Sequence, residues 1–275
     1  MMRLKPSAEI ANATHARASG NTRLPIRELM WGLPGSMLAA VHMDAMTGEP
    51  RWRQLYLEQA ARLLSELEET EKGPLWTQDL YGMHERWLGP VHGYAGNMVA
   101  LLRGWSWLGE AERSHVRDAV PRTLVANAHR SDMGVSWPAT AEGDEPPHRC
   151  QHCHGAPGMV TTFAGAPFST PELEGLVAAG GELAWNAGPL AKGSNLCHGT
   201  AGNGYAFLKL WQRTGEERWL DRARAFAMTA IAQCREARTQ HGRGRYSLWT
   251  GDIGLAVYLH DCLCGEARFP TIDVL

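Results

Sequence analysis

A tetrapeptide of the form Gly-x-x-Gly recurs five times in this chain of 275 residues, and each copy opens an apolar segment. One such tetrapeptide means little by itself, but five copies spaced about 45 to 60 residues apart are typical of an array of similar structural units. After four of the copies the apolar residues recur with helical spacing, as Met37, Leu38 and Val41 do after the first. We therefore expect inner helices to begin at the glycine turns, which occupy residues 32–35, 93–96, 155–158, 199–202 and 251–254.

Longer amphipathic segments separate these turns. The clearest covers residues 217–238, where Trp219, Ala223 and Phe226 share one helical face, and similar segments cover residues 52–67, 110–128 and 171–185. No stretch alternates with strand periodicity for long. The chain is thus predicted to be all-α, with inner and outer helices alternating around a ring. Helix N-termini gathered at one end of such a ring carry unpaired N–H groups that suit anionic or thiolate ligands.

Composition and charge favour a soluble protein over a nucleic-acid-binding or membrane-spanning one. Hydrophobic residues make up 44% and charged residues 20%, as in ordinary soluble proteins. The formal net charge of −2 offers no electrostatic case for a nucleic-acid partner, and no apolar run reaches the ~18 residues of a membrane span. The sequence shows no secretory signal, and a chain of this length is not typical of a disulfide framework. We therefore expect the six cysteines to be free thiols in a reducing, cytoplasmic location. Residues 1–24 are expected to form a disordered or non-native tail before one domain at 25–275.

Two of the turns follow a Cys-His pair, at Cys153-His154 and at Cys197-His198. A thiolate and an imidazole are ligands that Zn²⁺ prefers, and equivalent turns at one end of a ring would converge. We therefore predict a zinc site made by Cys153, Cys197 and His198, with a fourth position open. The alternative is a pair of buried thiols without metal. His154 is either a fourth ligand that closes the site or an acid/base beside an open one. The spacing Cys150-x-x-Cys153 also occurs in redox motifs, but these normally lie in a βαβ unit, which this sequence does not show. Cys262 and Cys264 lie on a predicted apolar helix and are assigned to the core.

Three further residues are candidates for catalysis. His92 precedes the second turn at the position that His154 and His198 hold in theirs, and a histidine titrates near neutral pH, so His92 is a candidate proton donor. Glu28, four residues before the first turn, could orient this histidine or take part in proton transfer. Arg149, four residues before Cys153, could bind a substrate carboxylate or a developing enolate. The alternative for His92 is a histidine that caps a helix, and the alternative for Glu28 and Arg149 is a solvated surface residue.

The chain resembles the lanthionine synthetase C-like family, which includes lantibiotic cyclases and eukaryotic relatives that bind glutathione. The resemblance rests on the segments 81–96, 153–158, 196–208 and 246–254, and the third of these, which begins Leu-Cys-His-Gly-Thr-Ala-Gly, is the most specific. It implies an α/α toroid, a double ring of inner and outer helices. It also implies that zinc is bound by Cys153, Cys197 and His198, and that His92 acts as acid/base with Glu28, Arg149 and His154 around it.

Two departures from the family pattern are visible. His152 stands where the family usually has Trp. The chain is also shorter than family members, so the ring is expected to be incomplete at its N-terminus or closed by a partner such as a second copy.

The resemblance implies zinc-dependent addition of a thiol to dehydroalanine or dehydrobutyrine. The thiol would be a peptide cysteine or a small molecule such as glutathione. A non-catalytic zinc-bound module that binds a thiol or a partner is the main alternative. An α/α-barrel carbohydrate enzyme is disfavoured because the turns carry His and Cys rather than paired carboxylates.

Overall fold

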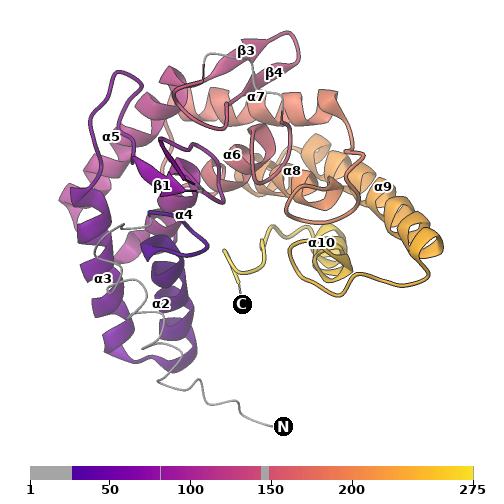
Figure 1. The fold of residues 1–275 in the computed structure, drawn as a ribbon, viewed down its shortest axis with the longest axis horizontal. Coiled ribbons are helices and arrows are strands. Elements are labelled where there is room, and N and C mark those ends of the chain that lie inside the picture. The colour runs from indigo at the N-terminus through magenta and orange to yellow at the C-terminus, as the bar shows by residue number, and fades with distance from the viewer. Residues whose placement is uncertain (1–26, 81, 144–148, 275) are drawn as a thin grey trace.

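The computed structural model describes residues 27–80, 82–143 and 149–274. The tail expected at residues 1–24 lies outside these ranges. The described chain is mostly helical, and its helices follow the order that the glycine turns predict (Figure 1).

Within the described ranges, five inner helices form an arc. They are α2 (Leu33–Thr47), α4 (Tyr94–Arg103), α6 (Ala156–Phe163), α8 (Thr200–Thr214) and α10 (Asp252–Cys264). Each contacts the next inner helix in this order. The residue before every one of them is the first glycine of a Gly-x-x-Gly turn, so the prediction that inner helices begin at these turns is confirmed. Helix α6 showed no helical periodicity in the sequence because all eight of its residues are buried.

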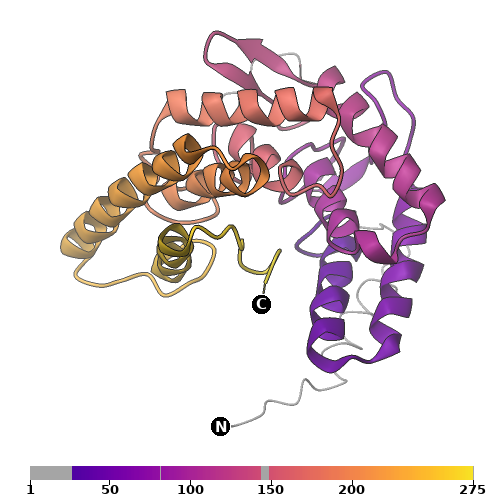
Figure 2. The same ribbon diagram turned by 180° about the vertical axis from the view of Figure 1, so that it is seen from behind.

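Four outer helices of the part of the chain that the structure describes cover the convex side of the arc (Figures 1 and 2). They are α3 (Pro50–Ser65), α5 (Glu110–Ala126), α7 (Pro171–Ala187) and α9 (Glu217–His241), with a short 3₁₀ turn, η1 (Trp105–Trp107), before α5. Helix α3 packs on α2, α7 on α6 and α8, and α9 on α8 and α10. The predicted all-α class, with alternating inner and outer helices, is therefore confirmed.

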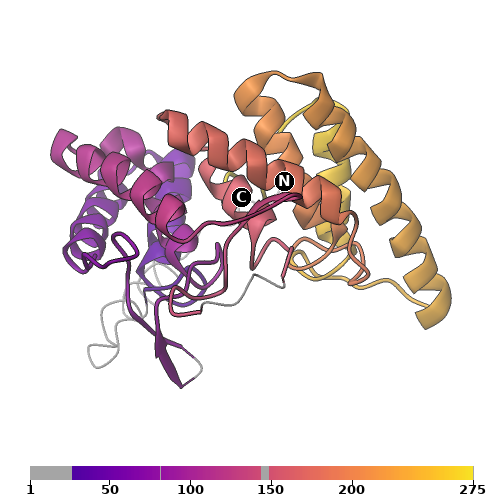
Figure 3. The ribbon, with the colours of Figure 1, turned by 90° about the horizontal axis from the view of Figure 1, so that it is seen from above.

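Two short hairpins add to the helices. Strands β1 (Gln78–Leu80) and β2 (Met83–Glu85) pair antiparallel, as do β3 (His129–Ser131) and β4 (Gly134–Ser136). The sequence does not predict these hairpins, because strands of three residues are too short for an alternating pattern to show. Figure 3 shows the first hairpin projecting from the side of the arc where the loops before the inner helices lie.

The C-terminal segment after α10 runs into the concave side of the arc (Figure 1). There Asp273 makes a buried ion pair with Lys209 of α8 at 2.8 Å and a second with Arg103 of α4 at 3.4 Å. Phe269 stacks on His152 with ring centroids 4.3 Å apart. This segment therefore ties inner helices from different parts of the chain together. No helix in the described ranges is both long and apolar enough to cross a bilayer.

Candidate functional site

The loop before each inner helix folds tightly against the helix that follows it. At the second glycine of every turn, an added Cβ would come within 3.0 Å of the carbonyl oxygen six residues earlier. The glycines therefore let the loop pass over the first turn of the helix, and the residues between the two contact points are held at the helix N-terminus. His92, Cys153, His154, Cys197 and His198 all lie in such loops, which gathers them at one end of α4, α6 and α8.

The two predicted thiol ligands lie side by side. The amide of Cys153 donates to the carbonyl of Cys197 at 3.0 Å, and the amide of Cys197 donates to the carbonyl of Trp249 at 2.9 Å. These bonds connect the loops that precede α6, α8 and α10. The two thiols also share a hydrogen bond, which lowers the pKa of Cys153 to about 7 and raises that of Cys197. Gln151 supports the arrangement by donating from Nε2 to the Cys153 sulfur at 3.0 Å.

His198, the third predicted ligand, follows Cys197 in the same loop. Its amide donates to Oδ1 of Asn195 at 3.1 Å, which fixes the backbone of the loop. Burial lowers the pKa of His198, and the positive charges of Lys192 and Arg245 lower it further. The imidazole is therefore held neutral, which is the form that binds metals.

Two adjacent thiols and a neutral imidazole are the donor set of a Cys₂His zinc centre, so these residues fit the ion chemically. The ligand atoms of Cys153, Cys197 and His198 do not all lie within 4.8 Å of one another. Within the described ranges, only the ligand atoms of His260, Cys264 and Glu266 do. The structure thus pairs the two thiols closely and leaves the imidazole further away.

His92 and the buried Glu28 form a pair near these thiols. Nδ1 of His92 lies 2.7 Å from Oε1 of Glu28, whose side chain is fully buried. The other carboxylate oxygen accepts the amide of Trp31 at 2.7 Å, and the Trp31 ring stacks on His92 with centroids 5.7 Å apart. Gln78 holds the His92 backbone by donating to its carbonyl at 2.7 Å. A positive charge on His92 would also lower the pKa of Cys153, so the two side chains lie within electrostatic range of each other.

His154 follows Cys153 in the loop before α6, and its ring lies near that of His92. Its ring centroid is 6.4 Å from that of His92 and 6.2 Å from that of Trp87. Burial lowers the pKa of His154 to about 4, and positive charge from Arg149, His92 and Lys192 adds to the effect. His154 is therefore neutral at physiological pH, which suits a ligand or a proton acceptor better than a proton donor. Arg149 itself is exposed at the edge of the site.

Lys192 and Arg245 are two further basic residues near the candidate site, and neither was among the residues predicted from the sequence. Lys192 reaches the thiol loop, where Nζ donates to Oε1 of Gln151 at 2.8 Å. Arg245 lies close enough to His198 to influence its pKa. A signal for Arg245 was present in the sequence, because Arg245 stands six residues before Gly251 just as Arg149 stands six residues before Gly155.

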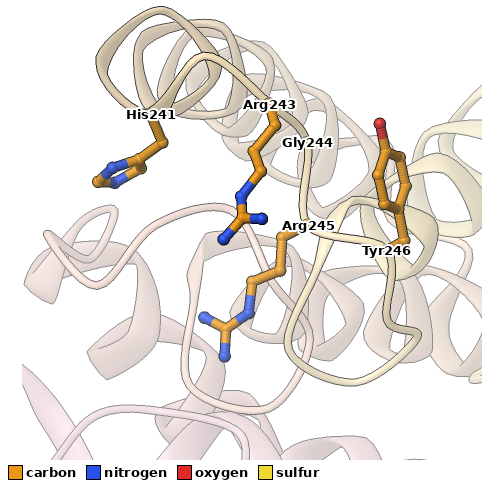
Figure 4. Close-up of a pocket in the computed structure, with 5 residues that line it drawn as sticks. All are labelled: His241, Arg243, Gly244, Arg245 and Tyr246. Carbon is orange, nitrogen blue, oxygen red and sulfur yellow. The ribbon is translucent and has the colours of Figure 1, made fainter.

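Arg245 also lines a cavity in the loop between α9 and α10. The cavity has a volume of about 590 Å³, and its lining residues are His241, Arg243, Gly244, Arg245 and Tyr246. Figure 4 shows the side chains of Arg243 and Arg245 extending in the same direction from this loop. Arg245, Lys192 and Arg149 make the surroundings of His154 and His198 positive, so an anionic ligand would be attracted to the candidate site.

The chain is similar in sequence to curated proteins from an animal and a plant. "Glutathione S-transferase LANCL1" of Danio rerio is 27% identical over 277 residues, covering 93% of this chain and 64% of that protein. "LanC-like protein GCL1" of Arabidopsis thaliana is 32% identical over 207 residues, covering 71% of this chain and 45% of that protein. The chain thus spans less than two thirds of the length of these curated relatives.

Structural comparison gives the same fold. A solved structure of "Nisin cyclase" superimposes with a TM-score of 0.68 over 92% of this chain and 68% of the cyclase, at 13% sequence identity. This likeness shows the toroid fold. The sequence model of the "Lanthionine synthetase C-like protein" family matches residues 7–274, nearly the whole chain. The chain therefore belongs to the lanthionine synthetase C-like family.

Proposed function

We propose that this chain catalyses zinc-dependent addition of a thiol to a dehydroalanine or dehydrobutyrine residue, forming a thioether. The observation that carries the proposal is the pair of His92 with the buried Glu28, close to the adjacent thiols of Cys153 and Cys197. A metal-binding thiol pair next to an oriented imidazole supplies the two functions that such an addition needs, which are thiol activation and proton delivery.

Cys153, Cys197 and His198 would hold the ion, which would supply stabilisation of the substrate thiolate. In the addition, the thiolate sulfur forms a bond to Cβ of the alkene, and the π electrons move toward Cα and the adjacent carbonyl as an enolate. The thiol proton is released on thiolate formation. His92 then delivers a proton to Cα, and the buried carboxylate of Glu28 fixes the ring through Nδ1 and stabilises the imidazolium before transfer.

The basic residues at the border bear on the choice of thiol. Arg149 lies near His154 and would stabilise the enolate or bind a carboxylate, while Lys192 and Arg245 surround His198 with positive charge. An anionic small thiol of the glutathione type would be attracted to such a border more strongly than a neutral one. The names of the relatives include both a glutathione S-transferase and a cyclase, so a peptide cysteine is the second candidate thiol.

A thiolate chemistry of this kind also requires a reducing compartment. All six cysteines are unpaired in the structure, and free thiols persist in the cytoplasm. We therefore place the activity there. A second copy of the chain that completes the arc is the partner we propose for it.

The experiment that tests the function has two stages. The first compares zinc content in the purified chain and in the Cys197→Ala variant, with Cys234→Ala as a thiol control outside the site. We expect the Cys197→Ala variant to hold one equivalent of zinc fewer and the control to hold the same amount as the original chain. Equal zinc in all three proteins would remove Cys197 from the ligand set.

The second stage follows thioether formation between glutathione and a dehydroalanine-containing peptide by mass spectrometry. We expect His92→Asn to keep its zinc and to lose activity by about 10² to 10⁴-fold, because it removes the proton donor alone. An unchanged rate would exclude His92 from catalysis. Zinc and saturable glutathione binding without turnover in the original chain would establish the non-catalytic alternative.

A further inference from the structure

A second group of metal-binding side chains lies at the C-terminal end of α10. Nε2 or Nδ1 of His260, Sγ of Cys264 and a carboxylate oxygen of Glu266 all lie within 4.8 Å of one another. The candidate zinc centre faces the other end of this helix, where the Gly251 turn begins it. Because a helix of 13 residues is about 20 Å long, the two groups of ligands are separate.

Local geometry explains why these three residues meet. His260 and Cys264 are four residues apart on a helix and so share a face, with Nε2 and Sγ 3.7 Å apart. Gly265 ends the helix in the left-handed conformation at φ 68°, and the amide of Glu266 donates back to the carbonyl of Asp261 at 3.0 Å. This reversal brings the Glu266 carboxylate under the pair.

A buried carboxylate supports the histidine from behind. Nδ1 of His260 lies 3.5 Å from Oδ1 of Asp261, which leaves Nε2 toward the cysteine. Asp261 is itself fixed, because its Oδ2 accepts the hydroxyl of Tyr205 at 3.0 Å and the amide of Arg268 at 3.1 Å. A carboxylate behind the distal nitrogen of a histidine is the usual support for a metal-binding imidazole.

We propose that His260, Cys264 and Glu266 bind a zinc-class divalent cation at a site separate from the candidate catalytic centre. One thiolate, one imidazole and one carboxylate are a mixed set that borderline-soft ions prefer, and three protein ligands leave a fourth position for water or another ligand. His260 and Cys264 are exposed, so the ion exchanges directly with solvent. This placement corrects the sequence analysis, which assigned both Cys262 and Cys264 to the core: Cys262 is buried and Cys264 is not.

Arg268 weakens Glu266 as a metal ligand. Its guanidinium contacts Oε2 of Glu266 and lies 3.6 Å from Oδ1 of Asp261. A bound cation must compete with this positive charge for the Glu266 carboxylate. Glu266 is therefore the weakest of the three ligands, and removing Arg268 strengthens metal binding.

The test is a Co²⁺ titration of the full chain that carries Cys197→Ala and His198→Ala, which disable the candidate catalytic centre. Failure of the proposed function therefore does not affect the result. We expect one equivalent of Co²⁺ to bind with a thiolate-to-cobalt charge-transfer absorption. His260→Gln or Cys264→Ser should abolish this absorption, and Cys234→Ser, a matched thiol change on α9, should leave it intact.

Two further variants distinguish direct binding of Co²⁺ by these side chains from an indirect effect of the substitutions on the fold. We expect Glu266→Gln to weaken Co²⁺ binding by about 10-fold and Arg268→Ala to tighten it. Should the disabled chain fail to fold, zinc content of the original chain and of its Cys264→Ser variant gives the same answer, with a difference of one equivalent expected. Absence of the absorption, its survival in both His260→Gln and Cys264→Ser, or equal zinc content would overturn the site.

Discussion

A side chain on the second glycine of any of the five turns would collide with the loop that leads into the helix. At Gly202 the added Cβ would meet the carbonyl of Leu196 and come 3.1 Å from Cβ of His152. The first of these neighbours is backbone, which cannot rotate away as a flexible side chain could. Gly202 therefore holds the loop of Cys197 and His198 on α8, and the shape of the candidate site depends on it.

Replacing Gly202 with alanine is expected to destabilise the protein by about 3 kcal/mol or more, since the collision forces the loop off the helix. Gly175→Ala is the matched control, because nothing lies within 4 Å of its added Cβ on the exposed side of α7. The control should gain about 0.5–1 kcal/mol from lower chain entropy in the unfolded state. Urea unfolding of both variants measures these changes, and similar values for the two would disprove the steric role.

At the scale of elements, one arginine fastens three helices. Arg213 at the end of α8 donates from Nη1 to the carbonyl of Ala166 at 3.0 Å and from Nη2 to that of Phe168 at 2.8 Å. Its Nε donates to Oε2 of Glu174 on α7 at 2.8 Å. The loop between α6 and α7 is thereby bound to α8. Only 11% of the Arg213 side chain is exposed, so these bonds are largely shielded from water.

Arg213→Lys keeps the charge but loses the planar fork of donors. Because at least two carbonyls would lose their partners, we expect the free energy of unfolding to fall by about 2–4 kcal/mol. Arg122→Lys is the control, since Arg122 makes comparable ion pairs with Glu69 and Asp118 at the exposed surface. Thermal unfolding should show little change in the control, and an equally small change at Arg213 would contradict the fastening role.

At the scale of the whole molecule, the C-terminal segment connects distant parts of the arc. Asp273 pairs with Lys209 of α8 and Arg103 of α4, and the backbone of Thr271 lies close enough to His42 of α2 to affect its pKa. Burial lowers the pKa of His42 from its ordinary 6.5, and the Arg103 charge lowers it further, while Thr271 and Asp273 act in the opposite direction. This contact makes the stability of the whole arc sensitive to acid.

The direction of the pH effect follows from this lowered pKa. As the pH falls below about 6.5, His42 takes up a proton in the unfolded chain before it does so in the folded one, so the free energy of unfolding decreases. His42→Asn should therefore lose less stability than the original chain between pH 7 and pH 5. His115→Gln, at an exposed position on α5, should follow the original chain. Parallel stability curves for His42→Asn and the original chain would refute the assignment.

The sequence by itself determined the helices and the residue types of the candidate site. The glycine turns marked where inner helices begin, and the amphipathic segments marked the outer ones, because steric limits and helical periodicity act within a few residues. The Cys-His pairs at these turns also led to the prediction that Cys153, Cys197 and His198 bind zinc. Their roles as zinc ligands, and the catalytic roles of His92, Glu28, Arg149 and His154, stay predictions.

Only the tertiary structure decided which of these residues meet. Glu28 and His92 are far apart in the chain and lie 2.7 Å apart in the fold, a distance set by the packing of α2 against α4. Packing also decided that Cys264 faces solvent with His260 while Cys262 is buried, since both lie on one apolar helix. Local sequence determines how a segment folds, whereas the contacts between segments distant in sequence depend on how the helices pack around the whole arc.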